Sequence, residues 1–298
     1  TDMWVVKYRK IWFTLSALLF ALSIGAMVVY GFNTSIDFKG GTITEVRYAD
    51  ARPEKEVLEA NIRNLDLGGF SIRPSESDRF IVRTRELNDE ERKSLLSALT
   101  PVGVSAPTIE RENSIGPVAG AELRSKAFKA VTVVVIMIVL FITFAFRKVS
   151  RPVSSWKYGL ATVVALLHDV IVPTGLFVFL GHTLGVEIDL LFVTGLLAIL
   201  GYSVHDSIVV FDRVRENLSL KKDESFEEVV GKSVTQTFAR SINTSLTIFI
   251  TLLALYLFGS TATKDFALLL MTGVVIGTYS SIFVGSPLLV TFQKWQKK

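Results

Sequence analysis

Residues 190–211 read LLFVTGLLAILGYSVHDSIVVF, an apolar run whose only ionisable side chains are those of His205 and Asp206. A helix needs about 20 predominantly apolar residues to cross the hydrocarbon core of a bilayer, and this run is long enough. Five more runs with few or no charges occupy residues 11–31, 127–146, 158–180, 241–263 and 266–293. The sequence therefore predicts a membrane α-helical bundle of six transmembrane helices, formed by segments 1–31 and 127–298.

The overall composition excludes several classes of protein. Half of the 298 residues are hydrophobic and the mean hydropathy is +0.45, which is too high for a soluble protein. The absence of cysteine excludes a disulfide framework, a thiolate metal site and a cysteine nucleophile. A net charge of +4, from 32 basic and 28 acidic residues, does not favour a nucleic-acid partner.

The charges are concentrated in one segment and otherwise lie on one side of the membrane. Residues 32–126 hold 14 of the basic and 16 of the acidic residues, which indicates a soluble domain between the first two spans. Of the other 18 basic residues (32 minus 14), sixteen lie in the short segments on one membrane face: Lys7, Arg9, Lys10, Arg147, Lys148, Arg151, Lys157, Arg213, Arg215, Lys221, Lys222, Lys232, Arg240, Lys294, Lys297 and Lys298. Because basic residues in short loops favour the cytoplasm, both termini are predicted to be cytoplasmic and residues 32–126 extracytoplasmic. The first run is too long for a signal peptide and is expected to be an uncleaved anchor.

The soluble segment has the pattern of a small α+β domain. Residues 43–48, 70–74, 80–84 and 104–111 have strand character, and residues 53–66 and 88–99 have helix character. Asn88 and Glu91 form a capping box that opens the second helix. The order βαββαβ predicts a ferredoxin-like fold. No convergent catalytic set is visible, and its polar residues are interpreted as a solvated surface.

Glycine-rich joints connect this domain to the spans. One joint holds Asp37, Gly40 and Gly41, and the other holds Gly116, Pro117 and Gly120. Turn chemistry alone would account for these residues. Hinges that let the domain swing relative to the spans would also use such positions, so both interpretations stay open.

Ionisable residues inside the spans are candidates for function because they are costly in a bilayer. His168 and Asp169 lie near the middle of the third span, and Asp206 shares a face of the fourth with Ser203. Arg240 opens the fifth span at a similar depth to Asp206. A carboxylate facing a guanidinium there could take up and release a proton, so Asp206 and Arg240 are predicted to form a proton relay.

The fifth span carries a stripe of polar residues on one helical face: Ser233, Gln236, Thr237, Arg240, Asn243, Thr244, Thr247 and Thr251. Such a stripe cannot face lipid and must face other helices or water. A hydrated path is one interpretation, in which Asp169, His168, His205, Ser203, Asn243, Thr244 and Thr247 support the relay. Plain helix packing through hydroxyl groups is the other, with Arg240 as an interfacial anchor.

Two further patterns concern helix packing. Gly273, Gly277, Ser281 and Gly285 recur at spacing four in the sixth span, which predicts close contact with another helix. Ser225 and Glu228 form a capping box, which we expect to open a short helix along the membrane before the fifth span.

The sequence contains no motif that supports nucleotide binding or metal binding. The triplet Gly231-Lys232-Ser233 resembles the end of a P-loop, but Phe226 stands where the required glycine should be. No HExxH motif occurs, and adjacent His-Asp side chains diverge by 100° on a helix, which disfavours a shared metal. We expect no cofactor, no metal and no enzymatic activity. The remaining driver is an ion gradient, worth about 2.3 kcal/mol per charge and 100 mV.

The segment Gly201-Tyr202-Ser203-Val204-His205-Asp206-Ser207-Ile208-Val209-Val210-Phe211-Asp212-Arg213, followed by Arg215-Glu216-Asn217, closely resembles the SecF family of the bacterial Sec protein-export machinery. Agreement extends through residues 37–41, 116–123, 168–169, 240–246 and 277–287. The resemblance implies an RND-like half-transporter in the bacterial cytoplasmic membrane, paired with SecD and working with the SecYEG channel. It also implies that proton flow drives the extracytoplasmic domain to draw out exported, unfolded polypeptides.

Within this resemblance, Asp206 and Arg240 match the membrane charge positions of the family. Position 205 is His where Asn is more usual, so a helper role for His205 does not carry over. Since a second set of six spans is absent, the resemblance is to a separate SecF and not to a fused SecDF. Two alternatives stay open: half of an RND-type exporter of small molecules or lipids, and a non-transporting scaffold of the channel complex.

Overall fold

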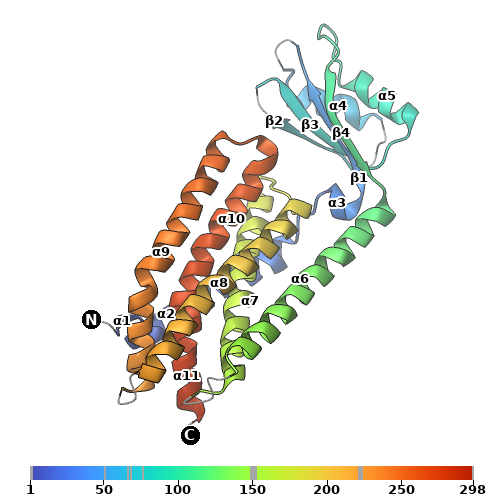
Figure 1. Cartoon of the computed structure of the whole chain (residues 1–298). Helices are drawn as coiled ribbons and strands as arrows, with labels where there is room; N and C mark the ends of the chain where they lie inside the picture. The colour runs from blue at the N-terminus through green and yellow to red at the C-terminus, as the bar shows by residue number, and fades with distance from the viewer. Residues whose placement is uncertain are drawn as a thin grey trace. The chain divides into compact units, whose positions relative to one another are not determined.

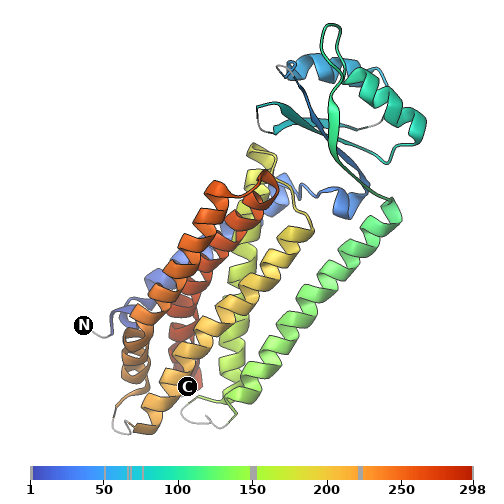
Figure 2. The same ribbon diagram turned by 45° about the horizontal axis from the view of Figure 1, so that its top comes forward.

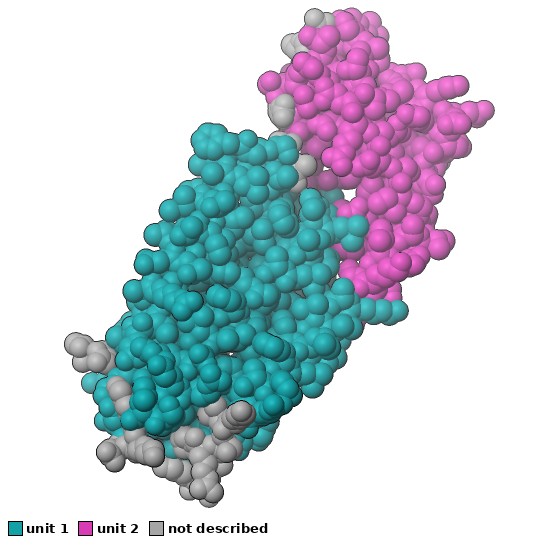
Figure 3. Space-filling view, viewed as in Figure 1, with its two compact units in different colours: residues 1–33, 129–298 teal, residues 34–128 magenta. Residues whose placement is uncertain are grey.

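The computed structural model describes residues 3–49, 52–65, 67, 69–75, 77–147, 153–220 and 224–296. The chain forms two compact units, shown in Figure 3: a membrane unit of residues 1–33 and 129–298, and an insert unit of residues 34–128. Six of the basic residues that predict the orientation lie outside the described residues, as does Asp66 at the end of an expected helix: Lys148, Arg151, Lys221, Lys222, Lys297 and Lys298.

Six helices among the described residues are long and apolar enough to cross a membrane, which confirms the six predicted spans. They are α2 (Arg9–Tyr30), α6 (Pro117–Ala145), α7 (Ser155–Thr183), α8 (Leu190–Leu220), α9 (Phe226–Phe258) and a sixth composed of α10 (Thr261–Ser280), the π-helical turn η1 (Ser281–Gly285) and α11 (Ser286–Gln296) (Figure 1). A short helix, α1 (Trp4–Lys7), precedes α2. The protein is therefore a multi-pass membrane protein.

Three of these helices, α7, α8 and α10, form the interior of the membrane unit. About half or more of their apolar windows is buried, whereas α2, α6 and α9 bury about a tenth or less and turn most of their surface outward. The predicted glycine seam brings α10 against α8. A Cβ atom on Gly277 would lie 3.2 Å from Cβ of Ser203, and one on Gly273 would lie 2.2 Å from Cδ1 of Ile199. The seam therefore permits the close contact that the sequence predicts.

One local expectation for the spans is wrong, and the sixth span has an irregularity that the sequence does not predict. The capping box of Ser225 and Glu228 is present, but it opens α9 itself, which continues to Phe258 as one helix. No separate helix along the membrane precedes the fifth span among the described residues. The sixth span is not one regular helix, because η1 interrupts it at residues 281–285. Widened turns of this kind occur mostly within α-helices and often at functional sites.

The insert unit contains the element order βαββαβ, preceded by the short helix α3 (Ile36–Lys39). Its elements are β1 (Gly41–Arg47), α4 (Lys55–Arg63), β2 (Ser71–Ser75), β3 (Arg79–Thr84), α5 (Asp89–Ala98) and β4 (Thr108–Ile115). The strands form one sheet in the order β2-β3-β1-β4, with each neighbouring pair antiparallel. The last strand begins four residues later than the sequence predicts. The capping box of Asn88 and Glu91 is confirmed.

Alternation along the strands separates the two faces of this sheet. Helices α4 and α5 lie on one face of the sheet (Figure 2). Val46, Phe80 and Val82 of the strands pack with Leu58 and Leu95 of these helices in one buried core.

The glycines of the predicted joints are closely packed. Gly40 and Gly41 have φ values of 78° and 131°, which residues with side chains rarely adopt. A Cβ atom on Gly40 would lie 2.8 Å from Cα of Pro117, and one on Gly120 would lie 2.8 Å from the nitrogen of Gly40. Turn geometry and close backbone approach thus require glycine here. The hinge interpretation stays a prediction.

Replacing Gly175 by alanine should weaken the packing of α7 against α2. The new Cβ would lie 2.3 Å from Cβ and 2.5 Å from Cα of Ser23, so backbone has to move. Overpacking of this kind costs about 1–3 kcal/mol. The matched control is Gly25→Ala, because nothing lies within 4 Å of the added Cβ. Thermal unfolding in detergent should show a lower transition temperature for the first variant only, and equal transitions would contradict this packing.

Burial of Tyr48 in the insert unit predicts a pH effect at high pH. Its hydroxyl donates to the carbonyl of Leu99 (2.7 Å), and desolvation raises the pKa of Tyr48 from 10 to about 12. A raised acid pKa stabilises the fold fully below pH 10, and this contribution is lost as pH rises from 10 to 12. The tyrosinate absorbance of the wild type minus that of Tyr48→Phe should titrate near pH 12. A difference titration near pH 10 would show that the phenol is solvated.

Candidate functional site

Asp206 lies between α8 and α9 and is 5% exposed. Its Oδ1 atom accepts a hydrogen bond from the Ser241 hydroxyl at 2.6 Å. Its Oδ2 atom is buried and has no hydrogen-bond partner among the described residues. A buried carboxyl oxygen without a partner is energetically costly, so this atom is available to bind a proton or a cationic group.

Arg240 does not pair directly with Asp206 in this arrangement. The guanidinium is exposed and interacts with the Asp206 carboxyl electrostatically, but no hydrogen bond or ion pair between the two is found within the described part of the chain. The reason is helical geometry. Ser241 is rotated by about 100° from Arg240 on α9, so the serine faces α8 and the arginine is turned to the surface.

The predicted polar stripe of α9 divides into two faces. Ser233 and Thr237 of the stripe are buried against α8 and α10, together with Ser241 and Ser245, which lie outside the predicted stripe and continue its spacing of four. The other face is exposed on this chain: Gln236, Arg240, Asn243, Thr244, Thr247 and Thr251. On α8, His205 is exposed in the same way, although its neighbour Asp206 is buried. The polar residues of the fifth span thus lie on two faces of α9. The buried face contacts helices of this chain, and the other face is exposed on it.

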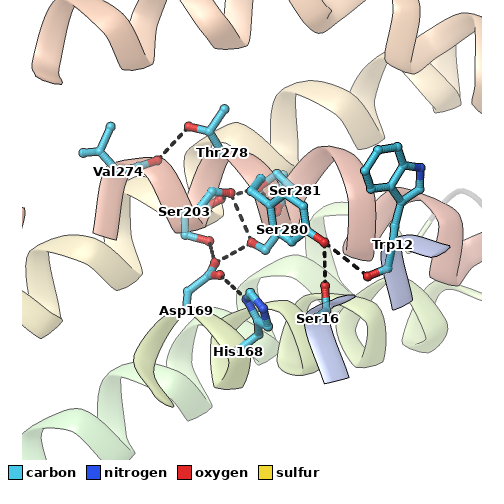
Figure 4. A network of polar contacts seen from close by, with 12 residues as sticks. Trp12, Ser16, His168, Asp169, Ser203, Val274, Thr278, Ser280 and Ser281 are labelled. Atoms are coloured by element: carbon cyan, nitrogen blue, oxygen red, sulfur yellow. Dashed lines mark hydrogen bonds and ion pairs between the residues drawn. The ribbon is translucent and has the colours of Figure 1, made fainter. Parts of the chain in front are cut away.

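A second carboxyl group, Asp169, lies inside the bundle with no exposed surface. Figure 4 shows that it is held by side chains from three helices. The hydroxyl groups of Ser203 on α8 and Ser280 on α10 both donate to its Oδ2 atom, the latter at 2.7 Å. Nδ1 of His168 lies 3.1 Å from its Oδ1 atom. The structure therefore brings the predicted residues His168, Asp169 and Ser203 together, separately from Asp206.

Smaller polar clusters extend from both carboxyl groups. Tyr202 bonds to Ser245 at 2.6 Å, and Ser245 bonds to Thr278 at 2.5 Å, which ties α8 and α9 to α10. Ser207 bonds to Ser281 at 2.9 Å and continues the glycine seam with a hydrogen bond. These interactions leave few hydroxyl groups of the interior without a partner, as a bilayer requires.

Sequence reasoning missed several of these residues: Ser207, Ser241, Ser245, Thr278, Tyr279 and Ser280. A signal was present for two of them, since Ser241 and Ser245 continue the spacing of four set by Ser233 and Thr237. No such signal identified Ser280, because serine residues on apolar helices commonly serve helix packing. Among the described residues, no group of three or more His, Asp or Glu side chains is arranged to hold a metal ion.

The family of the chain follows from its similarity to known proteins. A family model described as protein export membrane protein SecD/SecF, C-terminal, matches residues 95–295. Protein translocase subunit SecF of Thermobaculum terrenum is 38% identical over 99% of this chain and 94% of its own length. The chain belongs to the SecF family.

Larger SecDF proteins contain a region similar to this SecF family member. Protein translocase subunit SecDF of Thermus thermophilus is 38% identical, with 94% of this chain and 37% of the relative covered. The crystal structure of SecDF, a translocon-associated membrane protein from Thermus, matches with a TM-score of 0.82 and 36% identity. That match covers 98% of this chain and 38% of the SecDF chain, so this chain spans little more than a third of SecDF. The SecF family is one of protein translocase subunits, consistent with Sec-associated transport.

Proposed function

We propose that this chain is the SecF subunit of a Sec translocase that uses the proton-motive force, together with SecD, to promote protein translocation and release. The observation that carries the proposal is the arrangement around Asp206. A buried carboxyl group has one oxygen without a hydrogen-bond partner among the described residues. It interacts electrostatically with the guanidinium of Arg240, which lies on an exposed polar face of α9. Charged groups within spans typically mark ion pathways.

The uncovered face of α8 and α9 supports SecD as the partner. Arg240, Asn243, Thr247 and His205 are exposed on this chain, and side chains of this polarity are not stable against lipid. A second membrane subunit with its own polar face would cover them. SecDF relatives, in which a SecF-like region occupies little more than a third of one chain, support SecD as that subunit. By extension from the family we propose the SecYEG channel and exported, unfolded polypeptides as further partners.

The geometry suggests how a proton would act at Asp206. As a carboxylate, Asp206 accepts a hydrogen bond from Ser241 and attracts Arg240. Both interactions hold α8 and α9 in one relative orientation. A proton bound at Oδ2 removes the negative charge and with it the attraction for the guanidinium. Arg240 is then free to seek other acceptors on the partner face. Alternation between the two states would convert proton passage into movement of helices.

The remaining parts of the proposal concern topology. We propose the bacterial cytoplasmic membrane as the location, with both termini cytoplasmic and the insert unit extracytoplasmic, because sixteen of 18 span-flanking basic residues favour that orientation. We classify the insert unit as ferredoxin-like, which the βαββαβ order and the sheet order β2-β3-β1-β4 support. Movement at the joints around Gly40 and Gly120 would pass helix motion to it. We assign the chain no enzymatic activity and no cofactor.

An exporter of small molecules or lipids and a passive scaffold remain the competing functions. The small insert unit, residues 34–128, offers little material for a substrate cleft between extracytoplasmic domains, which disfavours the exporter. A scaffold would require neither the ionisable group at Asp206 nor the guanidinium of Arg240. Variants of these two residues therefore separate a scaffold from a proton-driven subunit.

Removing either charge should abolish gradient-dependent export. Asp206→Asn keeps the shape and the acceptor for Ser241 but cannot cycle a proton, and Arg240→Ala removes the opposing charge. In vesicles containing the variant with SecD and SecYEG, an imposed proton gradient should no longer raise the export rate above its gradient-free value. The exposed charges Asp89 and Arg124 provide controls, and Asp89→Asn and Arg124→Ala should keep full stimulation. Normal stimulation of Asp206→Asn with an assembled complex would refute the proposed role.

The partner face can be mapped by cysteine labelling, because the chain has no cysteine of its own. Asn243→Cys and Thr247→Cys place a thiol on the exposed face of α9, whereas Ser245→Cys places it inside. A water-soluble maleimide should label the first two in the detergent-solubilised chain, and SecD should reduce that labelling at least about tenfold. Ser245→Cys should stay unlabelled in both samples. Equal labelling with and without SecD would show that another partner covers this face.

A further inference from the structure

His168 and Asp169 form a buried titratable pair that is not part of the proposed relay of Asp206 and Arg240. Asp169 is held by Ser203, Ser280 and His168, and none of its surface is exposed (Figure 4). Three donors aimed at one carboxyl group stabilise its charged form. An apolar helix contact between α7, α8 and α10 needs none of these groups, so packing alone does not account for a carboxylate there.

His168 has one ring nitrogen with a partner and one without. Nδ1 faces the Asp169 Oδ1 atom at 3.1 Å, and since a carboxylate only accepts, the ring hydrogen lies on Nδ1. Nε2 then carries a lone pair. His168 is 3% exposed, and Nε2 has no hydrogen-bond partner among the described residues. A buried basic nitrogen that lacks a partner is a place where a proton can bind.

We infer that His168 and Asp169 form a second proton-binding site of this chain, in which the imidazole passes a proton to the carboxylate. A proton binds at Nε2 and forms a new N–H bond there. The N–H bond at Nδ1 breaks and its proton forms an O–H bond at Oδ1, so that the imidazole is again neutral with its hydrogen on Nε2. The acid O–H then donates to the free lone pair of Nδ1. The inference rests on the proposed proton-driven function and adds a site to it.

Tyr279 joins the surroundings of this pair to the first half of α2. The ring of Tyr279 lies 6.0 Å from that of His168, centroid to centroid. The Tyr279 hydroxyl bonds to the Ser16 hydroxyl at 2.9 Å and donates to the carbonyl of Trp12 at 3.1 Å. Trp12 and Ser16 lie in the first half of α2, near the basic N-terminal segment that is predicted to be cytoplasmic. These groups would carry water and protons toward Nε2.

Ser280 connects protonation of Asp169 to the helix packing. Its hydroxyl has one hydrogen and two acceptors within reach: Asp169 Oδ2 at 2.7 Å and the carbonyl of Gly277 at 3.1 Å. A neutral acid is a weaker acceptor than a carboxylate, so protonation shifts the hydroxyl toward Gly277. That releases the tie between α7 and α10 directly before the π-helical turn η1, where α10 already departs from regular geometry. Protonation of the second site would therefore change the contact between α7 and α10.

The charged and titratable surroundings of the pair are limited. From α8, Asp206 lies one turn beyond Ser203 but turns its side chain to Ser241 of α9, and Tyr202 bonds to Ser245. From α10 the titratable neighbour is Tyr279. On the described part of α2 between residues 11 and 29 no side chain is titratable. Asp206 projects from α8 toward α9, whereas Asp169 of α7 accepts a hydrogen bond from Ser203 of α8. The two carboxyl groups therefore have separate sets of donors.

Infrared difference spectroscopy of the chain reconstituted with SecD tests the site directly. Acidic minus alkaline spectra of the wild type should contain carboxylic-acid C=O bands from two buried groups. Asp206→Asn should remove one band and Asp169→Asn the other. Spectra of Asp169→Asn that equal those of the wild type would overturn the inference, because a purely structural carboxylate does not take up a proton.

The kinetics after a pH jump test the role assigned to His168. In His168→Gln the Asp169 band should still form, but at least about tenfold more slowly, since a positioned proton carrier is typically worth 10²–10⁴-fold. His182→Gln is the matched control, because His182 is exposed and stacks on Tyr30. It should leave the rate unchanged. An unchanged rate in His168→Gln would refute the relay step.

If the Asp169→Asn chain does not assemble with SecD, the site can still be tested with a variant that keeps both carboxyl groups. Ser280→Ala removes one donor to Oδ2 of the carboxylate, so the carboxylate stretching bands that Asp169 loses on acidification should change position, while those of Asp206 do not. Unchanged bands in this variant would also overturn the site. These readouts are independent of export. If Asp206→Asn keeps gradient stimulation, the proposed function fails, whereas the Asp169 band reports on the second site alone.

Discussion

In the hydrocarbon core of a bilayer, a polar group without a partner costs several kcal/mol, so each polar side chain of a span must be satisfied inside the protein or at an interface. This constraint organises the membrane unit. Asp169 is satisfied by donors from three helices, and Tyr202, Ser245 and Thr278 satisfy one another. Among the described residues, Asp206 is satisfied at one oxygen only. In the proposed function, SecD covers the polar face of α9 that this chain leaves exposed.

Helix α8 is the element through which these groups are connected. Its seam with α10 is close because Gly273 and Gly277 leave room for Ile199 and Ser203. Ser203 of this seam also donates to Asp169 of α7, and Asp206 lies one turn further on the same helix. A movement of α8 relative to α10 would therefore disturb both carboxyl groups together. If Asp206 and Asp169 bind protons as proposed, this shared support would let them act in one transport cycle.

The sequence shows which residues of the spans are ionisable, but it does not show which residues contact one another. It identified Asp206, Arg240 and Asp169 because charges within apolar runs stand out without any knowledge of packing. It predicted a direct pair of Asp206 and Arg240, whereas Ser241 occupies the facing position. One residue on a helix changes direction by about 100°, and no pattern in a single span reveals which of two adjacent polar residues faces the neighbour. The interruption at η1 was missed for a similar reason, since residues 266–293 form one unbroken apolar run.

The sequence by itself determined the six spans, the place of the soluble insert, its order of strands and helices, and the glycine seam. Each of these depends on local periodicity or on the length of apolar runs, which a chain carries without its neighbours. Only the tertiary structure decided that His168, Asp169, Ser203 and Ser280 meet, that Arg240 lies on the outside, and that the polar stripe of α9 serves two surfaces. Those outcomes depend on how the four helices α7, α8, α9 and α10 rotate against one another, and that rotation is set by the packing of all of them at once.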